Sequence, residues 1–328
     1  MRMATVRPAP PFDPECGATW RTISETMFQG RGPRIDAGSL ADTRAFELSN
    51  LDALLEGRAY SHRDVQLPGP GGDLTLSVFT PDDLTGTAPG VYWVHGGGMV
   101  AGSRFGAAEA MNAGTAVGAV VTSIEYRLAP EHPAPAPADD CYASLLWVAE
   151  HGGELGIDPT RIVLGGSSAG GGLAAATALR VRDSGGPALA GLLLCCPMLD
   201  DRMTSCSSGQ FDDALLWTRA SNEFGWRSLL GERFGTDDVT IYDVPGRATD
   251  LSGLPPTLVD VGSADLFRDE DVAFASTIWA SGGDCELYVW AGGYHGFELV
   301  APGSALAGDA AAARRRWIAR TLAKAASG

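Results

Sequence analysis

One serine in the chain stands where a strand, a tight turn and a helix are expected to meet. The segment IVLGGSSAGGGLA, residues 162–174, contains the pattern G-x-S-x-G at Gly166, Ser168 and Gly170. In such an elbow the serine hydroxyl stands clear of the backbone, and the two flanking glycines let the turn close without Cβ clashes. Ser168 is therefore predicted to be a nucleophile at the positive N-terminus of a helix. A glycine-rich turn used only for packing is the alternative, whereas no Gly-Lys-Ser/Thr phosphate-binding motif follows.

His295 is the predicted base for this serine. A serine hydroxyl is a poor nucleophile near neutral pH, so it needs a base, and the base needs an acid that orients it. The chain has histidines at 62, 95, 132, 151 and 295, and only the last follows Ser168. In one large class of hydrolases the order along the chain is serine, acid, histidine. His295 lies in the glycine-flanked loop AGGYHGFEL, which suits an imidazole delivered at the edge of a sheet.

The acid of the predicted triad should lie between these two residues, just after a strand. The segment PTLVDVGSADLFRDED offers Asp260, Asp265, Asp269, Glu270 and Asp271. The first of these is inside the apolar run, and the last three begin the next helix, where acidic residues suit the helix dipole in any case. Asp265 sits in the loop after the strand and is predicted to be the acid.

A second glycine-rich loop could supply hydrogen-bond donors for the same reaction. The segment VYWVHGGGMVAG, residues 91–102, runs from an apolar strand into three glycines. Acyl transfer through a serine passes through a tetrahedral oxyanion, which needs N–H donors already in position. The backbone N–H groups of Gly97, Gly98 and Ala169 are predicted to form this oxyanion hole. His95 is expected to anchor the loop by hydrogen bonds rather than to act as the base.

Apolar, β-branched runs alternate with Ala-rich helical stretches, which predicts an α/β fold with a mainly parallel, doubly wound sheet. The runs at 90–96 and 118–126 suit strands covered on both faces. The residues near 63–80 suit an antiparallel edge of the sheet. Further strands are expected at 161–167, 189–197, 256–262 and 285–292, and helices at 138–151, 268–281 and 306–325.

Two segments do not fit this alternation. Residues 1–60 are polar, have helical stretches and precede the first strand. Residues 198–250 interrupt the strand rhythm and carry many large apolar side chains, which predicts a lid over a ligand site. An ordinary packed excursion is the alternative. The apolar residues of this insert are Met198, Met203, Phe211, Leu215, Leu216, Trp217, Phe224 and Trp226.

The composition excludes several classes of protein. The chain has 328 residues with a formal net charge of −16, so its surface repels polyanions and nucleic-acid binding is not expected. Neither a targeting segment nor a stretch of 18 apolar residues is evident, so we expect a cytoplasmic protein without a membrane span. The six cysteines lack zinc-site spacing, and Cys195 and Cys196 are expected to be reduced core residues.

The chain resembles the bacterial hormone-sensitive-lipase-like esterases, an α/β-hydrolase family, and looks closest to the heroin-esterase-like acyl esterases within it. The resemblance covers the chain from about residue 60 to the end and departs from the common pattern at Ser167, Met99 and HPAPAP. The matching stretches are HGGG at 95–98, YRLAPE at 126–131, GGSSAGGGLA at 165–174, DLFRDE at 265–270 and YHGF at 294–297.

This resemblance implies an α/β-hydrolase fold with a mostly parallel eight-stranded sheet in a catalytic domain at 61–328. It also implies a helical cap built from an N-terminal cap segment at 1–60 and the insert at about 198–250. It implies a serine carboxylesterase acting on small-molecule esters without metal or cofactor, and a possible homodimer paired through the last strand. Short acyl chains are expected, because a lid over a modest pocket disfavours long ones. Residues expected to shape the substrate pocket are Met99, Phe211, Leu216 and Trp217. Two alternatives stay open. One is a hydrolase of lactones, carbamates or amides with the same triad, and the other is a non-catalytic binding protein of this fold.

Overall fold

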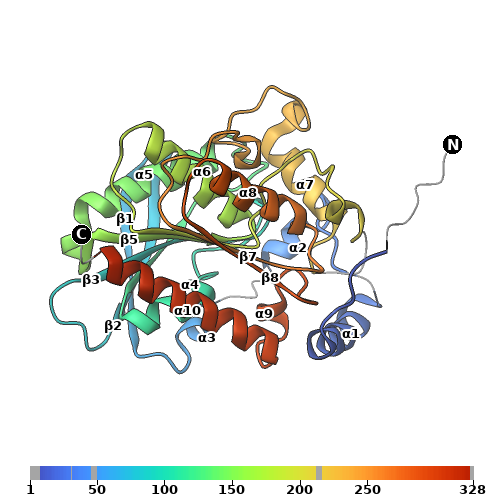
Figure 1. Ribbon diagram of the computed structural model, residues 1–328, viewed down its shortest axis with the longest axis horizontal. Coiled ribbons are helices and arrows are strands. Elements are labelled where there is room, and N and C mark those ends of the chain that lie inside the picture. Colours follow the sequence, from blue (N-terminus) through green and yellow to red (C-terminus); the bar gives the residue numbers. More distant parts are fainter. Residues whose placement is uncertain (1–7, 31, 46–49, 212–215, 326–328) are drawn as a thin grey trace.

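An eight-stranded sheet forms the centre of the molecule in the computed structural model, which describes residues 8–30, 32–45, 50–211 and 216–325 (Figure 1). The strand order is β1-β2-β4-β3-β5-β6-β7-β8. Strands β1 and β2 pair antiparallel with each other, and β2 pairs antiparallel with β4, whereas all later neighbours pair parallel. The predicted mostly parallel, doubly wound sheet with an antiparallel edge is therefore confirmed.

The strands have the following bounds: β1 Tyr60–Gly69, β2 Gly72–Pro81, β3 Ala88–Val94, β4 Val120–Glu125, β5 Ile157–Ser167, β6 Gly191–Cys195, β7 Thr257–Gly262 and β8 Cys285–Trp290. The helices are α1 Pro14–Phe28, α2 Leu40–Ala45, α3 Leu51–Leu55, α4 Ala108–Gly114, α5 Ala136–His151, α6 Ala169–Asp183, α7 Arg219–Leu230, α8 Arg268–Ala280, α9 Phe297–Val300 and α10 Ala305–Ala325. Short 3-10 turns lie at Thr115–Val117, Gly152–Leu155, Ser207–Gly209, Gly231–Arg233 and Pro245–Arg247.

Helices cover both faces of the sheet, because successive residues of each buried strand point to opposite sides. On one face Tyr92 and Leu164 belong to the core cluster that also holds buried residues of α5, α6 and α8. On the other face Trp93 and Val163 pack with residues of α4 and α10. Figure 1 shows these two helical layers above and below the sheet. The parallel strands therefore bring their carboxyl ends to one buried edge, where loops can meet.

The two segments that break the alternation lie near each other. Helix α7 belongs to the insert between β6 and β7, and α1 and α2 belong to the N-terminal segment, which Figure 1 shows at the same end of the molecule. The backbone N–H of Ile35 donates to Ser221 Oγ at 3.0 Å, which joins the two segments. Their roles as cap and lid, and the domain boundary at residue 60, stay predictions. Parts of both fall on residues 1–7, 31, 46–49 and 212–215, Leu215 among them, outside the described residues.

None of the helices in the described ranges is both long enough and apolar enough to cross a membrane.

Candidate active site

Ser168 occupies a strained turn between β5 and α6. Its φ of 55° and ψ of −122° lie outside the regions that non-glycine residues prefer, as a sharp strand-to-helix turn requires. The helix starts directly against β3, since a Cβ atom on Gly170 would lie 2.1 Å from the carbonyl oxygen of Val94. Only glycine fits this close approach. The turn directs the hydroxyl of Ser168 away from the sheet and toward the loop after β8.

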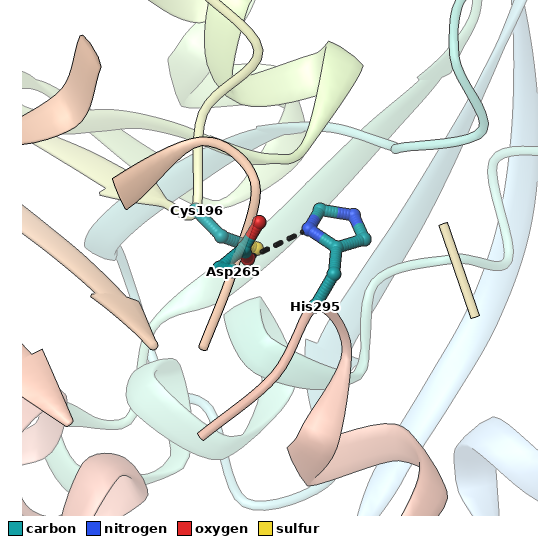
Figure 2. A group of neighbouring side chains, drawn as sticks. All are labelled: Cys196, Asp265 and His295. Atoms are coloured by element: carbon teal, nitrogen blue, oxygen red, sulfur yellow. Dashed lines mark hydrogen bonds and ion pairs between the residues drawn. The ribbon is translucent and has the colours of Figure 1, made fainter. Parts of the chain in front are cut away.

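The structure brings together the three residues predicted as a triad. Ser168 Oγ lies 3.0 Å from His295 Nε2, and His295 Nδ1 lies 2.9 Å from Asp265 Oδ2. Figure 2 shows the second of these contacts. The other carboxylate oxygen of Asp265 accepts a hydrogen bond from the backbone N–H of Phe267 at 3.0 Å. Asp265 is fully buried, and these two donors hold its carboxylate in place. The carboxylate can therefore determine the tautomer of His295, with the proton on Nδ1.

The loop that carries His295 is fixed from two sides. The ring of Phe267 meets the imidazole edge to face, with centroids 5.1 Å apart. On the other side, the hydroxyl of Tyr294 donates to the carbonyl of Cys16 in α1 at 3.1 Å. The backbone N–H of Asp13 donates to the carbonyl of Gly292 at 3.0 Å. The N-terminal segment therefore helps to position the imidazole, although it lies far away in the sequence.

The glycine loop after β3 is anchored by the buried side chain of His95. His95 is 1 % exposed and stacks on Tyr126, with centroids 4.2 Å apart, and its Nδ1 lies 2.8 Å from the carbonyl of Gly96. Burial lowers the pKa of His95, which favours a neutral anchoring ring. Within the described part of the chain, the N–H groups of Gly97, Gly98 and Ala169 donate to no protein acceptor. A Cβ atom on the first glycine, Gly96, would lie 3.2 Å from Ser168 Cβ, so this loop borders the serine.

Trp217 covers the glycine loop. A Cβ atom on Gly98 would lie 2.1 Å from Trp217 Cη2, so the indole packs directly on the backbone of this glycine. The indole N–H donates to Asn222 Oδ1 at 3.1 Å, and the ring centroid lies 6.4 Å from that of His295. Leu216 lies close to the same loop, with Cδ2 3.0 Å from the position of a Cβ atom on Gly296. These two residues of the insert therefore line the surroundings of Ser168 and His295.

Met99 and Phe211 lie deeper in the molecule. Met99 is fully buried with a φ of 63°, and its methyl group lies 3.8 Å from the position of a Cβ atom on Gly172 in α6. Phe211 is 5 % exposed and belongs to the larger core cluster. The substrate-binding role of these two residues stays a prediction.

The other four carboxylates considered as the acid have different surroundings. Asp260 accepts from Arg314 Nε at 2.8 Å, and Asp269 pairs with Arg268 at 2.8 Å. Glu270 accepts the backbone N–H of Leu199 at 2.8 Å, which holds the loop after β6. Burial raises the pKa of Glu270 and Asp271 well above the ordinary range of a carboxyl group, which favours the neutral form of both side chains.

Sequence reasoning missed three neighbours of the triad. Phe267 holds both Asp265 and His295, α1 holds the loop before His295, and Cys196 lies beside Asp265. A signal for the third was present, because Cys196 lies at the end of the strand predicted at 189–197 and Asp265 lies in the loop after the next predicted strand. The carboxyl ends of neighbouring parallel strands meet at one edge of a sheet. Nothing in the sequence indicated the contact with α1.

Known proteins resemble this chain in sequence and in fold. Residues 91–299 match the alpha/beta hydrolase fold family. The chain is 34% identical to the esterase LipI of Mycobacterium tuberculosis over 252 residues, which cover 73% of this chain and 76% of that protein. It is also 34% identical to the carboxylesterase NlhH of the same species over 286 residues, covering 82% and 86%. The solved structure of a bacterial heroin esterase matches with a TM-score of 0.83 and 37% identity, covering 95% of this chain and 98% of that one.

The strand order, the elbow at Ser168 and the family match define an α/β hydrolase. The chain belongs to the alpha/beta hydrolase fold family. Within it, the predicted resemblance to the hormone-sensitive-lipase-like esterases is confirmed.

Proposed function

We propose that this protein is a serine carboxylesterase that cleaves small esters with short acyl chains through an acyl-enzyme on Ser168. The observation that carries the proposal is the hydrogen-bonded chain Ser168–His295–Asp265, with contacts of 3.0 and 2.9 Å. The esterases among its relatives support the same activity.

In the proposed reaction, His295 Nε2 takes the hydroxyl proton while Ser168 Oγ attacks the ester carbonyl. The N–H groups of Gly97, Gly98 and Ala169 stabilise the oxyanion that forms. The imidazolium then gives its proton to the leaving alcohol, and Asp265 stabilises the positive ring while it exists. Water attacks the acyl-enzyme with His295 again as base, and the acid leaves with Ser168 restored.

The preference for short acyl chains rests on how closely the site is covered. Ser168 is 8 % exposed, His295 6 % and Trp217 5 %, so little surface remains around the reacting atoms. The indole that lies on Gly98 occupies space next to the proposed oxyanion hole. A long acyl chain would have to displace this side chain or find another path, whereas an acetyl or butyryl group needs less room.

The proposal is tested with two adjacent serines. Ser168→Ala is expected to reduce the turnover of p-nitrophenyl acetate and butyrate on the order of 10⁴-fold or more, because a triad without its nucleophile loses most of its effect. Ser167→Ala serves as the matched control and is expected to stay within a few-fold of the unchanged protein. A fluorophosphonate should label the unchanged protein and not Ser168→Ala. Activity of Ser168→Ala equal to that of the control would refute the assignment.

A panel of esters, lactones, carbamates and amides then defines the bond that is cleaved. Turnover numbers highest for short esters would support the proposal. A higher kcat/KM for another class would reassign the substrate while leaving the triad in place.

We also propose a homodimer paired through β8, the last strand of the sheet, which has one neighbouring strand among the residues that the structure describes. Val289 in this strand is 43 % exposed, and Tyr288 stacks on Trp290 beside it. An edge strand of this kind can pair with its copy. Light scattering should give the mass of a dimer for the unchanged protein and of a monomer for Val289→Lys. The cytoplasmic location stays a prediction.

A further inference from the structure

A thiol lies beside the triad and has no part in the proposed reaction. Cys196 Sγ, a carboxylate oxygen of Asp265 and a ring nitrogen of His295 all lie within 4.8 Å of one another. Figure 2 shows the sulfur next to the carboxylate, on the side of the imidazole that faces Asp265. Three donor types, sulfur, oxygen and nitrogen, therefore converge at one point.

The backbone holds Cys196 in this place. Its N–H donates to the carbonyl of Asp260 at 2.6 Å, which ties it to β7. The residue before it is tied to the elbow, because the N–H of Ser168 donates to the carbonyl of Cys195 at 2.8 Å. Two residues later, the N–H of Met198 donates back to the carbonyl of Ser168 at 2.8 Å. With a φ of 38°, Cys196 turns the chain between these two anchors, so its position is fixed together with the triad.

We propose that Cys196, Asp265 and His295 form a binding site for a thiophilic divalent cation such as Zn²⁺, and that its occupation switches the enzyme off. Thiolate, imidazole and carboxylate are all common zinc ligands, whereas Mg²⁺ and Ca²⁺ prefer oxygen alone. The two anionic ligands would balance the charge of the cation. Zinc–sulfur and zinc–nitrogen distances near 2.3 and 2.0 Å place tetrahedral donors about 3.5 Å apart. The donor atoms that lie farthest apart therefore need to approach by at most about 1.3 Å, and water completes the shell.

Inhibition follows from where the protons lie. A neutral imidazole has one protonated nitrogen and one lone pair. In the free enzyme Nδ1 carries the proton and Nε2 offers its lone pair to the hydroxyl of Ser168. A cation on Nδ1 needs a lone pair on that nitrogen, so the ring proton must move from Nδ1 to Nε2, and the Cys196 thiol loses its proton to solvent. His295 then has no lone pair with which to accept the proton of Ser168. Asp265 binds the cation and no longer orients the imidazole.

Binding is measured first, because it does not depend on any activity. The unchanged protein and Ser168→Ala are titrated with Zn²⁺ in competition with a coloured chelator, and with Co²⁺ while the thiolate-to-cobalt absorption band is followed. Both proteins are expected to bind one cation at this site and to show the band. Cys196→Ala and Cys196→Ser are expected to lose the band and to bind Zn²⁺ at least 10-fold more weakly. Cys206→Ala, at a partly exposed cysteine of the insert, is the matched control and should bind as the unchanged protein does.

Inhibition is measured second, and this part rests on the proposed esterase function. Zn²⁺ should inhibit p-nitrophenyl acetate turnover of the unchanged protein and of Cys206→Ala, and excess EDTA should restore the rate. For each Cys196 variant, compared with its own rate without metal, the half-inhibiting concentration should rise at least 10-fold. A cobalt band that persists in both Cys196 variants, or equal inhibition of all proteins, would overturn the proposal. Tight binding in a protein that hydrolyses no ester would instead refute the proposed function and leave the metal site standing.

Discussion

Replacing Asp265 tests how much its carboxylate contributes to catalysis by orienting the imidazole of His295. Asp265→Asn keeps the size of the side chain but removes the charge that stabilises the imidazolium, and it allows the wrong ring tautomer. We expect kcat to fall about 10³- to 10⁴-fold for p-nitrophenyl butyrate. Asp269→Asn is the control, because Asp269 pairs with Arg268 and not with His295. Similar losses in both variants would contradict the role of Asp265.

Trp217 is the residue through which the site should limit acyl chain length. Its indole lies on Gly98 and is 5 % exposed, so Trp217→Ala removes a wall next to the serine. We expect kcat/KM for p-nitrophenyl octanoate to rise relative to the butyrate by about 10-fold, in line with the 1–3 kcal/mol that pocket contacts contribute to specificity. Trp279→Ala, at an indole that is 47 % exposed on α8, should leave this ratio unchanged. An unchanged ratio in Trp217→Ala would place the limit elsewhere.

At the residue scale, chain order and local pattern were enough to predict which residues the fold brings together. The glycines around Ser168 predict it as the nucleophile, and His295 is the one histidine that follows it in the sequence. The neighbours of these residues could not be predicted in the same way. The contact between Trp217 and Gly98 depends on how the insert folds back over the loop after β3. The periodicity of the sequence does not predict a contact between residues so far apart in the chain.

At the scale of elements, the N-terminal helix α1 supports the loop that carries His295. Gly292 has a φ of +83°, and a Cβ atom on it would lie 2.1 Å from the backbone nitrogen of Asp13. Gly292→Ala should therefore push α1 away from this loop, lower the free energy of unfolding by about 1–3 kcal/mol and reduce kcat. Gly282→Ala has a similar φ of +79° but no atom within 4 Å. This control should lose stability through backbone strain alone and keep its kcat.

The measurement for this pair is urea unfolding together with p-nitrophenyl butyrate turnover at 25 °C. Equal kcat values in the two variants would show that α1 does not position His295.

The elements themselves were largely predictable, because each buried strand is a short apolar run bounded by turn residues. The strand expected at 161–167 is longer in the structure, where β5 starts at Ile157. Its first residues include Asp158, Pro159 and Thr160, so they do not belong to the apolar run from which the strand was predicted. The order of the strands was not predictable. β3 lies between β4 and β5, an arrangement set by which helices cover which face of the sheet and not by any single segment.

At the scale of the whole molecule, one buried cluster of charges joins distant parts of the chain. Arg314 in α10 forms ion pairs with Asp260 in β7, at 2.8 Å, and with Glu298 in α9. Glu109 in α4 adds a further negative charge to the field around Glu298. One guanidinium therefore faces several carboxylates in a place that excludes most water, and not all of them can be ionised at low cost.

Glu298 is the group that should make folding stability depend on pH. Burial, with the neighbouring negative charges of Asp260 and Glu109, raises its pKa from 4.5 to about 7, although Arg314 lowers it in part. Between these two pH values the folded protein holds a proton that the unfolded chain has lost. The free energy of unfolding contributed by this group is therefore largest below pH 4.5, falls as the pH rises toward 7, and stays low above that value.

The glutamine side chain of the Glu298→Gln variant cannot ionise. The unfolding free energy of this variant should therefore not show the fall that ionisation of Glu298 causes as the pH rises toward 7. When the pH rises from 5 to 8, the difference in unfolding free energy between the variant and the unchanged protein should change by about 1–3 kcal/mol in favour of the variant. This is less than the full effect of the pKa shift, because the side chain of Glu298 is 17 % exposed. Urea unfolding at both pH values measures this difference. Glu286→Gln is the matched control, because its pair with Arg320 lies at the surface and contributes little at either pH. If Glu298→Gln and Glu286→Gln differ from the unchanged protein by the same amount at both pH values, the cluster does not link pH to folding.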